Sequence, residues 1–71
     1  MQKQAQIKFV IRRTDGSFLV KLNKSMCIMT WTNDKQFAKT FALKSACHFV
    51  ETYADAGFGM LSSDVDIIEL D

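Results

Sequence analysis

Apolar and polar residues alternate in two stretches near the start of the chain, and a turn dipeptide separates them. Residues 6–13 and residues 18–22 each repeat with a period of two, which is typical of a strand with one buried face. Between them, Asp15-Gly16 has a backbone that tolerates the positive φ of a tight turn, so the pattern predicts a β-hairpin. The positions expected to face the core are Ile7, Phe9 and Ile11 in the first strand and Phe18, Val20 and Leu22 in the second.

Two further stretches predict strands of different character. Residues 26–31, MCIMTW, are apolar on both faces. Such a stretch indicates a central strand, a strand covered on both sides, or a strand with one face given to a partner. Residues 65–70, VDIIEL, form the last predicted strand. Its place within the sheet stays open, because the pattern does not say which strand it pairs with.

A helical pattern lies between these two strands and is the strongest periodic signal in the chain. The spacing predicts a helix over residues 43–55, with Gly57 just beyond it as a residue suited to a helix end. The start is less well marked, because Ala42 is a poor capping residue and Thr40 and Ser45 are alternative boundaries. The apolar face is expected to comprise Leu43, Ala46, Cys47, Val50, Tyr53 and Ala54, widened by Phe49.

The element order β-β-β-α-β predicts an α+β fold in a single domain, residues 1–71. We expect a small, largely antiparallel sheet of three to four strands with one helix packed on one face. The apolar fraction of 48% is typical of a folded globular chain. A helix of roughly 13 residues is marginal alone, so its apolar stripe must pack against the strands.

The composition also bears on the compartment. No apolar run approaches the ~20 residues that span a bilayer, and the first residues lack the apolar segment of a signal peptide. We therefore expect a cytoplasmic protein with no membrane partner. In that setting Cys27 and Cys47 are expected to be reduced and buried as small hydrophobes, with a disulfide between them as the alternative.

The net charge of +1 hides a strong asymmetry along the chain. All nine Lys and Arg lie in residues 1–44 with two carboxylates, a net +7, whereas residues 45–71 carry six carboxylates and no Lys or Arg, a net −6. The favoured interpretation is that the acidic last strand lies beside the basic first hairpin. A nucleic-acid-binding face, an acidic docking tail and head-to-tail self-association are the alternatives.

The sequence contains no constellation typical of catalysis. His48 is the one His and falls on the polar side of the predicted helix, where a solvated surface role is expected. Neighbouring helix positions point about 100° apart, so Cys47 does not converge with it. Asp64 and Asp66 are interpreted as a solvated strand face or salt-bridge partners rather than a cation site. We therefore expect no catalytic residues, no metal site, no cofactor and no enzymatic activity.

Two surfaces are candidate binding sites. Residues 8–21 carry a cluster of cations suited to an acidic or nucleic-acid partner, although Phe9 and Phe18 are assigned to the core rather than to base stacking. Residues 57–63 either close the core or form an exposed docking loop. Trp31 is either a core-edge residue or an anchor for a partner. The candidate protein-binding residues are Lys8, Arg12, Arg13 and Lys21 in the hairpin and Phe58, Met60 and Leu61 in the loop.

A short pattern in the middle of the chain extends into the last strand. It consists of Trp31, Thr32, Asp34, Ala38, Phe41 and Ala46, followed by V-x-I-I-E-L at residues 65–70. With these residues the chain resembles, over residues 7–70, the small accessory proteins of bacteriophages and prophages. Ala42 departs from the Ser or Thr that is usual there.

The resemblance implies a small, non-enzymatic phage-type protein in the cytoplasm of a bacterial host. Such proteins bind and inhibit or modulate a host or phage protein, including components of host defence systems. A domain of this size suits one interface of ~800 Å². The alternatives are a nucleic-acid-binding module that uses residues 8–21 and a structural homodimer that completes its core through residues 26–31, so both a monomer and a homodimer stay open.

Overall fold

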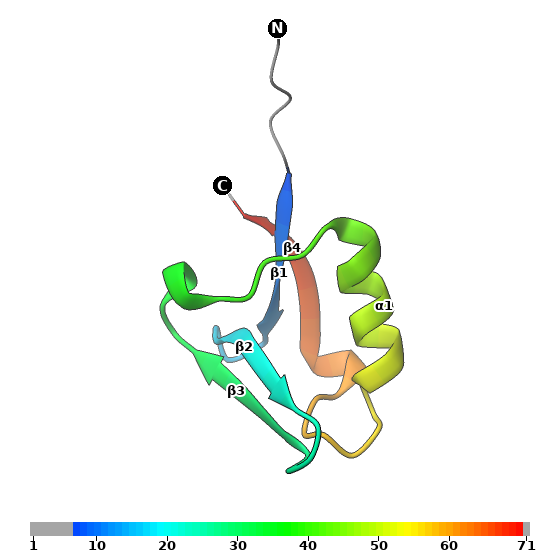
Figure 1. Cartoon of the computed structure of the whole chain (residues 1–71). Helices are drawn as coiled ribbons and strands as arrows, with labels where there is room; N and C mark the ends of the chain where they lie inside the picture. Colours follow the sequence, from blue (N-terminus) through cyan, green and yellow to red (C-terminus); the bar gives the residue numbers. More distant parts are fainter. Residues whose placement is uncertain (1–6, 71) are drawn as a thin grey trace, which may run out of the picture.

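In the computed structural model, which describes residues 7–70, four strands form one antiparallel sheet with a single α-helix on one face (Figure 1). The elements are β1 (Lys8–Arg13), β2 (Phe18–Asn23), β3 (Ile28–Thr32), the 3₁₀ turn η1 (Lys35–Phe37), α1 (Leu43–Tyr53), the 3₁₀ turn η2 (Ser62–Asp64) and β4 (Val65–Leu70). The predicted α+β class and element order are confirmed. Residue 6, where the first strand was predicted to begin, lies outside the described residues. No helix in the described part of the chain is long and apolar enough to cross a bilayer.

The strand order is β3-β2-β1-β4, so the last strand lies beside the first. β4 pairs antiparallel with all of β1, and α1 packs against these two strands. Arg12 of β1 stands directly opposite Asp66 of β4, and opposite charges on neighbouring strands stabilise a sheet. The prediction that the acidic last strand lies beside the basic first hairpin is therefore confirmed.

The first hairpin turns at the predicted dipeptide. Gly16 adopts a φ of 93°, and the N–H of Arg13 donates to the Ser17 carbonyl at 2.7 Å. The Asp15 carboxylate accepts hydrogen bonds from the Ser17 hydroxyl at 2.6 Å and from the Ser17 N–H at 2.9 Å. These bonds, the hydroxyl first, hold the pKa of Asp15 below its ordinary value. The turn is thus fixed by its own side chains.

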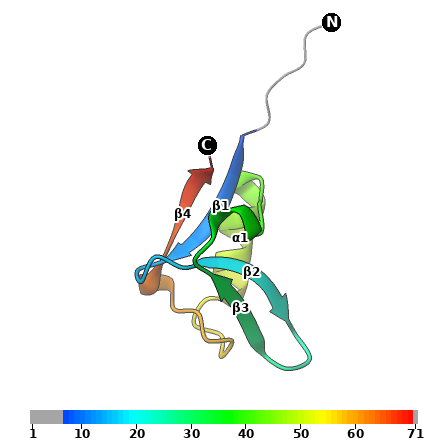
Figure 2. The same cartoon turned by 90° about the vertical axis from the view of Figure 1, so that its left-hand side faces the viewer.

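β1 and β2 separate soon after this turn, and a later segment ties them together. The two strands pair at a single register position next to the turn. Farther along, the N–H of Lys39 donates to the Leu19 carbonyl of β2 at 2.8 Å. Phe41 then exchanges two backbone hydrogen bonds of 2.8 Å with Phe9 of β1. Residues 39–41 therefore bond to both strands, and Figure 2 shows the chain after β3 crossing beside them.

The core forms where β2 changes its alternation. The register with β3 shifts between Leu19 and Lys21, which marks a β-bulge, and a bulge changes the face to which side chains point. Leu19 is therefore buried in the core, whereas Phe18 and Val20, predicted to face it, are only half-buried. Leu22, beyond the bulge, packs against the core as predicted. The central cluster of buried side chains comprises Ile11, Leu19, Met29 and Met60.

β1 is covered on both of its faces near its middle. The neighbouring residues Val10 and Ile11 point to opposite faces, and both are fully buried. On the face away from α1, Ala38 lies with Leu70 of β4 around one hollow, so the chain after β3 covers part of this face (Figure 2). Ile7, predicted to face the core, is exposed because it precedes the paired part of the strand.

The third strand lies at the edge of the sheet, which corrects the prediction of a central or doubly covered strand. β3 begins at Ile28, because Cys27 takes a positive φ of 55° at the end of the preceding turn. Met26 is 64% exposed and Ile28 is 51% exposed. This stretch therefore keeps apolar surface exposed at the edge of the sheet. The third predicted arrangement, a face given to a partner, stays a prediction.

α1 packs on the core with most of the predicted apolar stripe, but two members of that stripe are exposed. Ala42 precedes it in an extended conformation and gives no side-chain cap. Leu43 and Cys47, expected to be buried, are exposed because the helix is rotated toward its aromatic residues. Cys27 is exposed as well, so both cysteines are free, as expected, but neither is the buried hydrophobe that was predicted. The buried and half-buried residues of the helix are Ala46, Phe49, Val50 and Tyr53.

Candidate functional site

Arg13 of the predicted basic hairpin is engaged within the fold. Its Cζ lies 4.0 Å from the centroid of the Trp31 ring, and its Nε donates to the Ser17 hydroxyl at 3.2 Å. A terminal nitrogen of the same guanidinium lies 3.8 Å from an Asp15 carboxylate oxygen. Such a guanidinium cannot turn to a ligand without losing these partners. Trp31 packs against the core, which agrees with its interpretation as a core-edge residue.

The other three cations of the hairpin lie on the sheet face away from α1. The register puts Lys8 and Arg12 of β1 on this face together with Lys21 of β2, and all three are exposed. Asp66 stands opposite Arg12, and the fully buried Val10 lies between the two β1 cations. The three charges are thus separated and partly balanced. A continuous basic platform with free rings, which single-stranded nucleic acid favours, is not formed by these residues.

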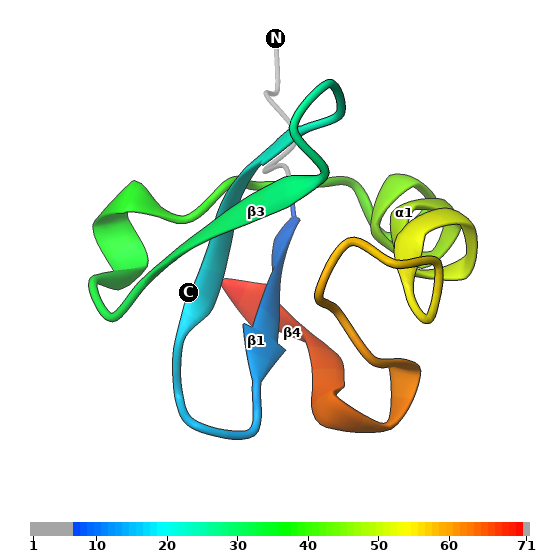
Figure 3. The ribbon, with the colours of Figure 1, turned by 90° about the horizontal axis from the view of Figure 1, so that it is seen from below.

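The second predicted surface, the loop after α1, mainly closes the core. Met60 is 1% exposed and belongs to the central cluster, and the half-buried Phe58 packs edge-on against Tyr53 with centroids 5.3 Å apart. Figure 3 shows this loop, between α1 and β4, from below. Leu61 alone of the three candidate residues is exposed, at 55%. The core-closing interpretation therefore holds for Phe58 and Met60.

A groove of about 620 Å³ runs along one side of α1. Its apolar wall is a row of touching aromatic rings, with centroid distances of 5.4 Å from Phe41 to Phe49 and 4.8 Å from Phe49 to Tyr53. Each ring is half-buried, so the row packs on the core and still borders the groove. A concave aromatic surface of this kind suits an apolar side chain of a ligand. The lining residues are Phe41, Lys44, Ser45, His48, Phe49 and Tyr53.

Positive charge borders both ends of the aromatic row. The Nζ of Lys39 lies 5.5 Å from the centroid of Phe41, and the Nζ of Lys24 lies 5.5 Å from the centroid of Tyr53. The Tyr53 hydroxyl, mainly through a hydrogen bond, holds the pKa of Lys24 above its ordinary value. Lys44 stands in the wall itself, and no carboxylate is among the described residues that line the groove. The groove therefore suits an anionic ligand with an apolar part.

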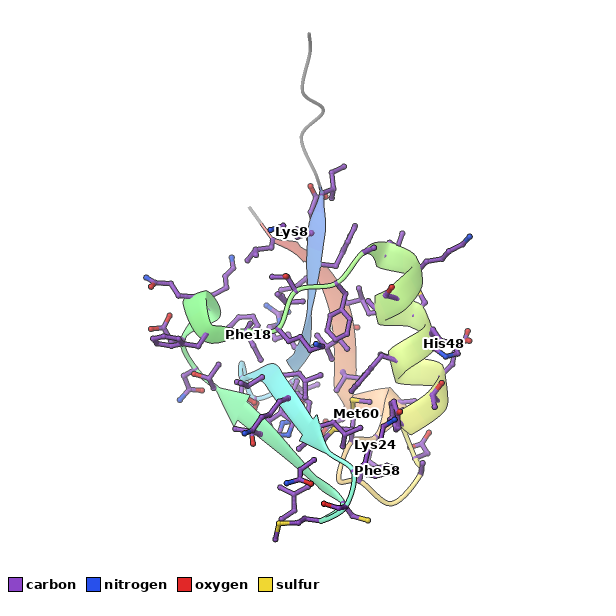
Figure 4. All side chains as sticks on the ribbon, viewed as in Figure 1. Lys8, Phe18, Lys24, His48, Phe58 and Met60 are labelled. Atoms are coloured by element: carbon purple, nitrogen blue, oxygen red, sulfur yellow. The ribbon has the colours of Figure 1, made fainter. Side chains whose placement is uncertain are left out.

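Two distant segments bring these groups together. α1 places its aromatic residues one turn apart on a single side. The turn after β2 supplies Lys24, and its shape is set by the Asn23 side-chain oxygen, which accepts from the Ser25 hydroxyl at 2.9 Å and from the Met26 N–H at 3.3 Å. Figure 4 shows Lys24 next to Phe58, close to the C-terminal end of α1. The hairpin tip thus places a positive charge beside Tyr53, at one end of the groove.

The groove also contains one imidazole, that of His48. His48 is exposed, as predicted, and its Nε2 lies 3.4 Å from the Thr52 hydroxyl. Within residues 7–70, no group of three or more His, Cys, Asp or Glu residues is placed to hold a metal ion. The aromatic wall and the surrounding ammonium groups are suited to reversible contacts with apolar and acidic groups.

The sequence prediction does not contain this groove. One local signal points to it, because Phe49 and Tyr53 are one helical turn apart and Lys44 and His48 are one turn apart beside them. The contribution of Lys24 rests on a contact between segments far apart in sequence, which a local pattern does not reveal.

Comparisons of the chain with protein-family models, with curated proteins and with solved structures found no match. The resemblance to phage accessory proteins, and the function that it implies, therefore stay predictions.

Proposed function

We propose that this chain is a small, non-enzymatic interaction protein that binds another protein by holding an acidic segment in the groove along α1. The observation that carries the proposal is the aromatic row with lysines at its ends and in its wall. An apolar side chain of the partner would sit against the rings. Neighbouring Asp or Glu residues would then meet Lys24, Lys39 and Lys44.

The geometry favours a peptide over a single-stranded nucleic acid. Base stacking needs a free ring face. Here the Phe49 ring is tilted by 54° against Phe41 and by 50° against Tyr53, and the Tyr53 ring is tilted by 85° against Phe58. Lysines already lie near the rings of Phe41 and Tyr53. Phosphate is also bound well by the planar fork of Arg, and Arg13 is engaged by Trp31.

The resemblance to phage accessory proteins supplies the biological part of the proposal. The partner would be a host or phage protein in the bacterial cytoplasm, and binding would inhibit or modulate it. An acidic surface on a host-defence component is a partner of the required chemistry, because its carboxylates complement the lysines of the groove.

A titration followed by NMR tests the proposal without knowledge of the natural partner. Isotope-labelled protein is titrated with a random copolymer of Glu and Tyr, with polyglutamate and with oligothymidylate. We expect the copolymer to bind best and to shift the amides of residues 41–53 and of Lys24, because it alone combines carboxylates with rings. The binding should weaken as salt is added, since these exposed charges are screened.

Two charge reversals make the test specific. Lys44→Glu should weaken copolymer binding by roughly fivefold or more, because an attraction becomes a repulsion. Lys21→Glu makes the same charge change on the other face of the sheet and should leave the affinity within about twofold. If oligothymidylate binds more tightly than the copolymer and shifts residues 8–21, the nucleic-acid-binding alternative replaces the proposal.

A further inference from the structure

The two edges of the sheet differ in charge. β4 forms one edge and carries the exposed carboxylates Asp66 and Glu69. β3 forms the other edge, and none of its five residues is charged. Natural sheets discourage the addition of another strand by placing charged residues or proline at their edges. β3 has neither device, and no described strand lies on its outer side, so its edge is open to another strand.

We propose that β3 pairs antiparallel with β3 of a second copy of this chain and so forms a two-fold dimer with one continuous sheet. In a register centred on Thr30, Ile28 of each copy lies opposite Thr32 of the partner subunit, and no like charges face one another. Met26 precedes one end of the strand, and Phe37, 66% exposed, follows the other end. Antiparallel pairing brings these apolar side chains toward each other at both ends of the interface.

Pairing of β3 with β3 is favoured over the two other ways in which the sheet edges of two copies could pair. Two β4 edges would set the carboxylates of Asp66 and Glu69 against each other. Pairing of β3 with β4 of another copy would leave one free β3 edge and one free β4 edge at the ends of the assembly, so further copies would add to an open chain. Pairing of β3 with β3 closes after two copies. The dimer does not depend on the groove, whose lining residues all lie in residues 41–53.

Disulfide cross-linking tests the proposed register. In a background with Cys27→Ser and Cys47→Ser, Thr30→Cys sets two thiols opposite each other at the two-fold axis, with Cβ atoms about 5 Å apart. Mild oxidation should then give a covalent dimer. Thr52→Cys, an exposed position on α1, is the matched control. It should cross-link at least roughly tenfold more slowly, because its thiols are not held at a high effective concentration.

Sedimentation equilibrium provides an independent measurement. The mass of the unmodified chain should rise from 8.1 kDa toward twice that value as concentration increases. Thr30→Lys should stay monomeric, because it sets two ammonium groups opposite each other, and its unchanged circular dichroism would show that it folds. Equal cross-linking of the two cysteine variants, or a wild-type chain that stays monomeric at the highest concentrations, would overturn the proposal.

Discussion

Asp55 shows how much a single residue contributes to the path of the chain after α1. Its φ is 61°, a left-handed conformation that Asp tolerates better than most residues. Its N–H donates to the Met60 carbonyl at 2.7 Å, and its carboxylate accepts from the Ser62 hydroxyl at 2.7 Å and from the Ser62 N–H at 3.1 Å. The helix ends at Tyr53, two residues before the end that the sequence pattern predicts at residue 55.

The Asp55 carboxylate makes the stability of this loop dependent on pH. The hydrogen bonds from Ser62, the hydroxyl first, hold the pKa of Asp55 below its ordinary value of 3.8. A depressed pKa contributes stability that is present above the unfolded-state value and is lost as pH falls through the folded-state value, here below about pH 4. Asp55→Asn keeps the left-handed conformation accessible but removes the charge.

Thermal unfolding between about pH 7 and pH 3 measures this effect. We expect the melting temperature of wild type to fall by more over this range than the melting temperature of Asp55→Asn. Glu51→Gln, which removes an exposed carboxylate of α1, serves as the control and should follow wild type. An Asp55→Asn curve parallel to that of wild type would show that the hydrogen bonds to the carboxylate do not favour its charged form.

At the scale of elements, the loop between α1 and β4 works as part of the core. Met60 and Leu61 are neighbours in sequence, but the first is 1% exposed and the second 55%. Met60 packs with residues of three strands, and Phe58 extends the aromatic row of the helix. A connection that supplies core residues is expected to be ordered, because it cannot move without uncovering them.

These two neighbours give a matched pair of substitutions. Met60→Ala should destabilise the fold by about 2–5 kcal/mol, because it removes a buried side chain and leaves a cavity. Leu61→Ala removes a similar number of atoms at the surface and should change stability by less than about 0.5 kcal/mol. Urea denaturation of the two variants measures both values. Equal effects would contradict the burial of Met60.

Local pattern decides some of these elements and not others. The first hairpin was predictable from Asp15-Gly16 between two alternating stretches, and the helix from its period, because both depend on residues close in sequence. Which side chains of β2 face the core was not predictable, since the bulge after Leu19 breaks the alternation that the prediction assumes. Residues 39–41 bond to two distant strands, and the positive charge beside Tyr53 comes from Lys24 of a distant turn. No local period marks such long-range contacts.

At the scale of the whole molecule, two parts share one core. β1, β4 and α1 pack together, whereas β2 and β3 form a hairpin that pairs with β1 at a single register position. Residues 39–41 bond to both parts. The buried cluster takes its residues from β1, β2, β3 and the loop after the helix. A domain of 71 residues buries too little apolar surface for either part to be stable alone.

We therefore expect the hairpin and the helical part to unfold in one transition. Trp31 fluorescence reports on β3 and circular dichroism reports on α1, so urea titrations followed by both signals should give the same midpoint. Leu19→Ala removes a fully buried side chain from β2 and should lower stability by about 2–5 kcal/mol in both signals equally. Lys21→Ala, exposed in the same strand, should change either signal by less than about 0.5 kcal/mol. A Trp31 transition at lower urea than the helix transition would mean that the hairpin opens alone. In that case, the shared cluster and residues 39–41 would be too weak to couple the two parts.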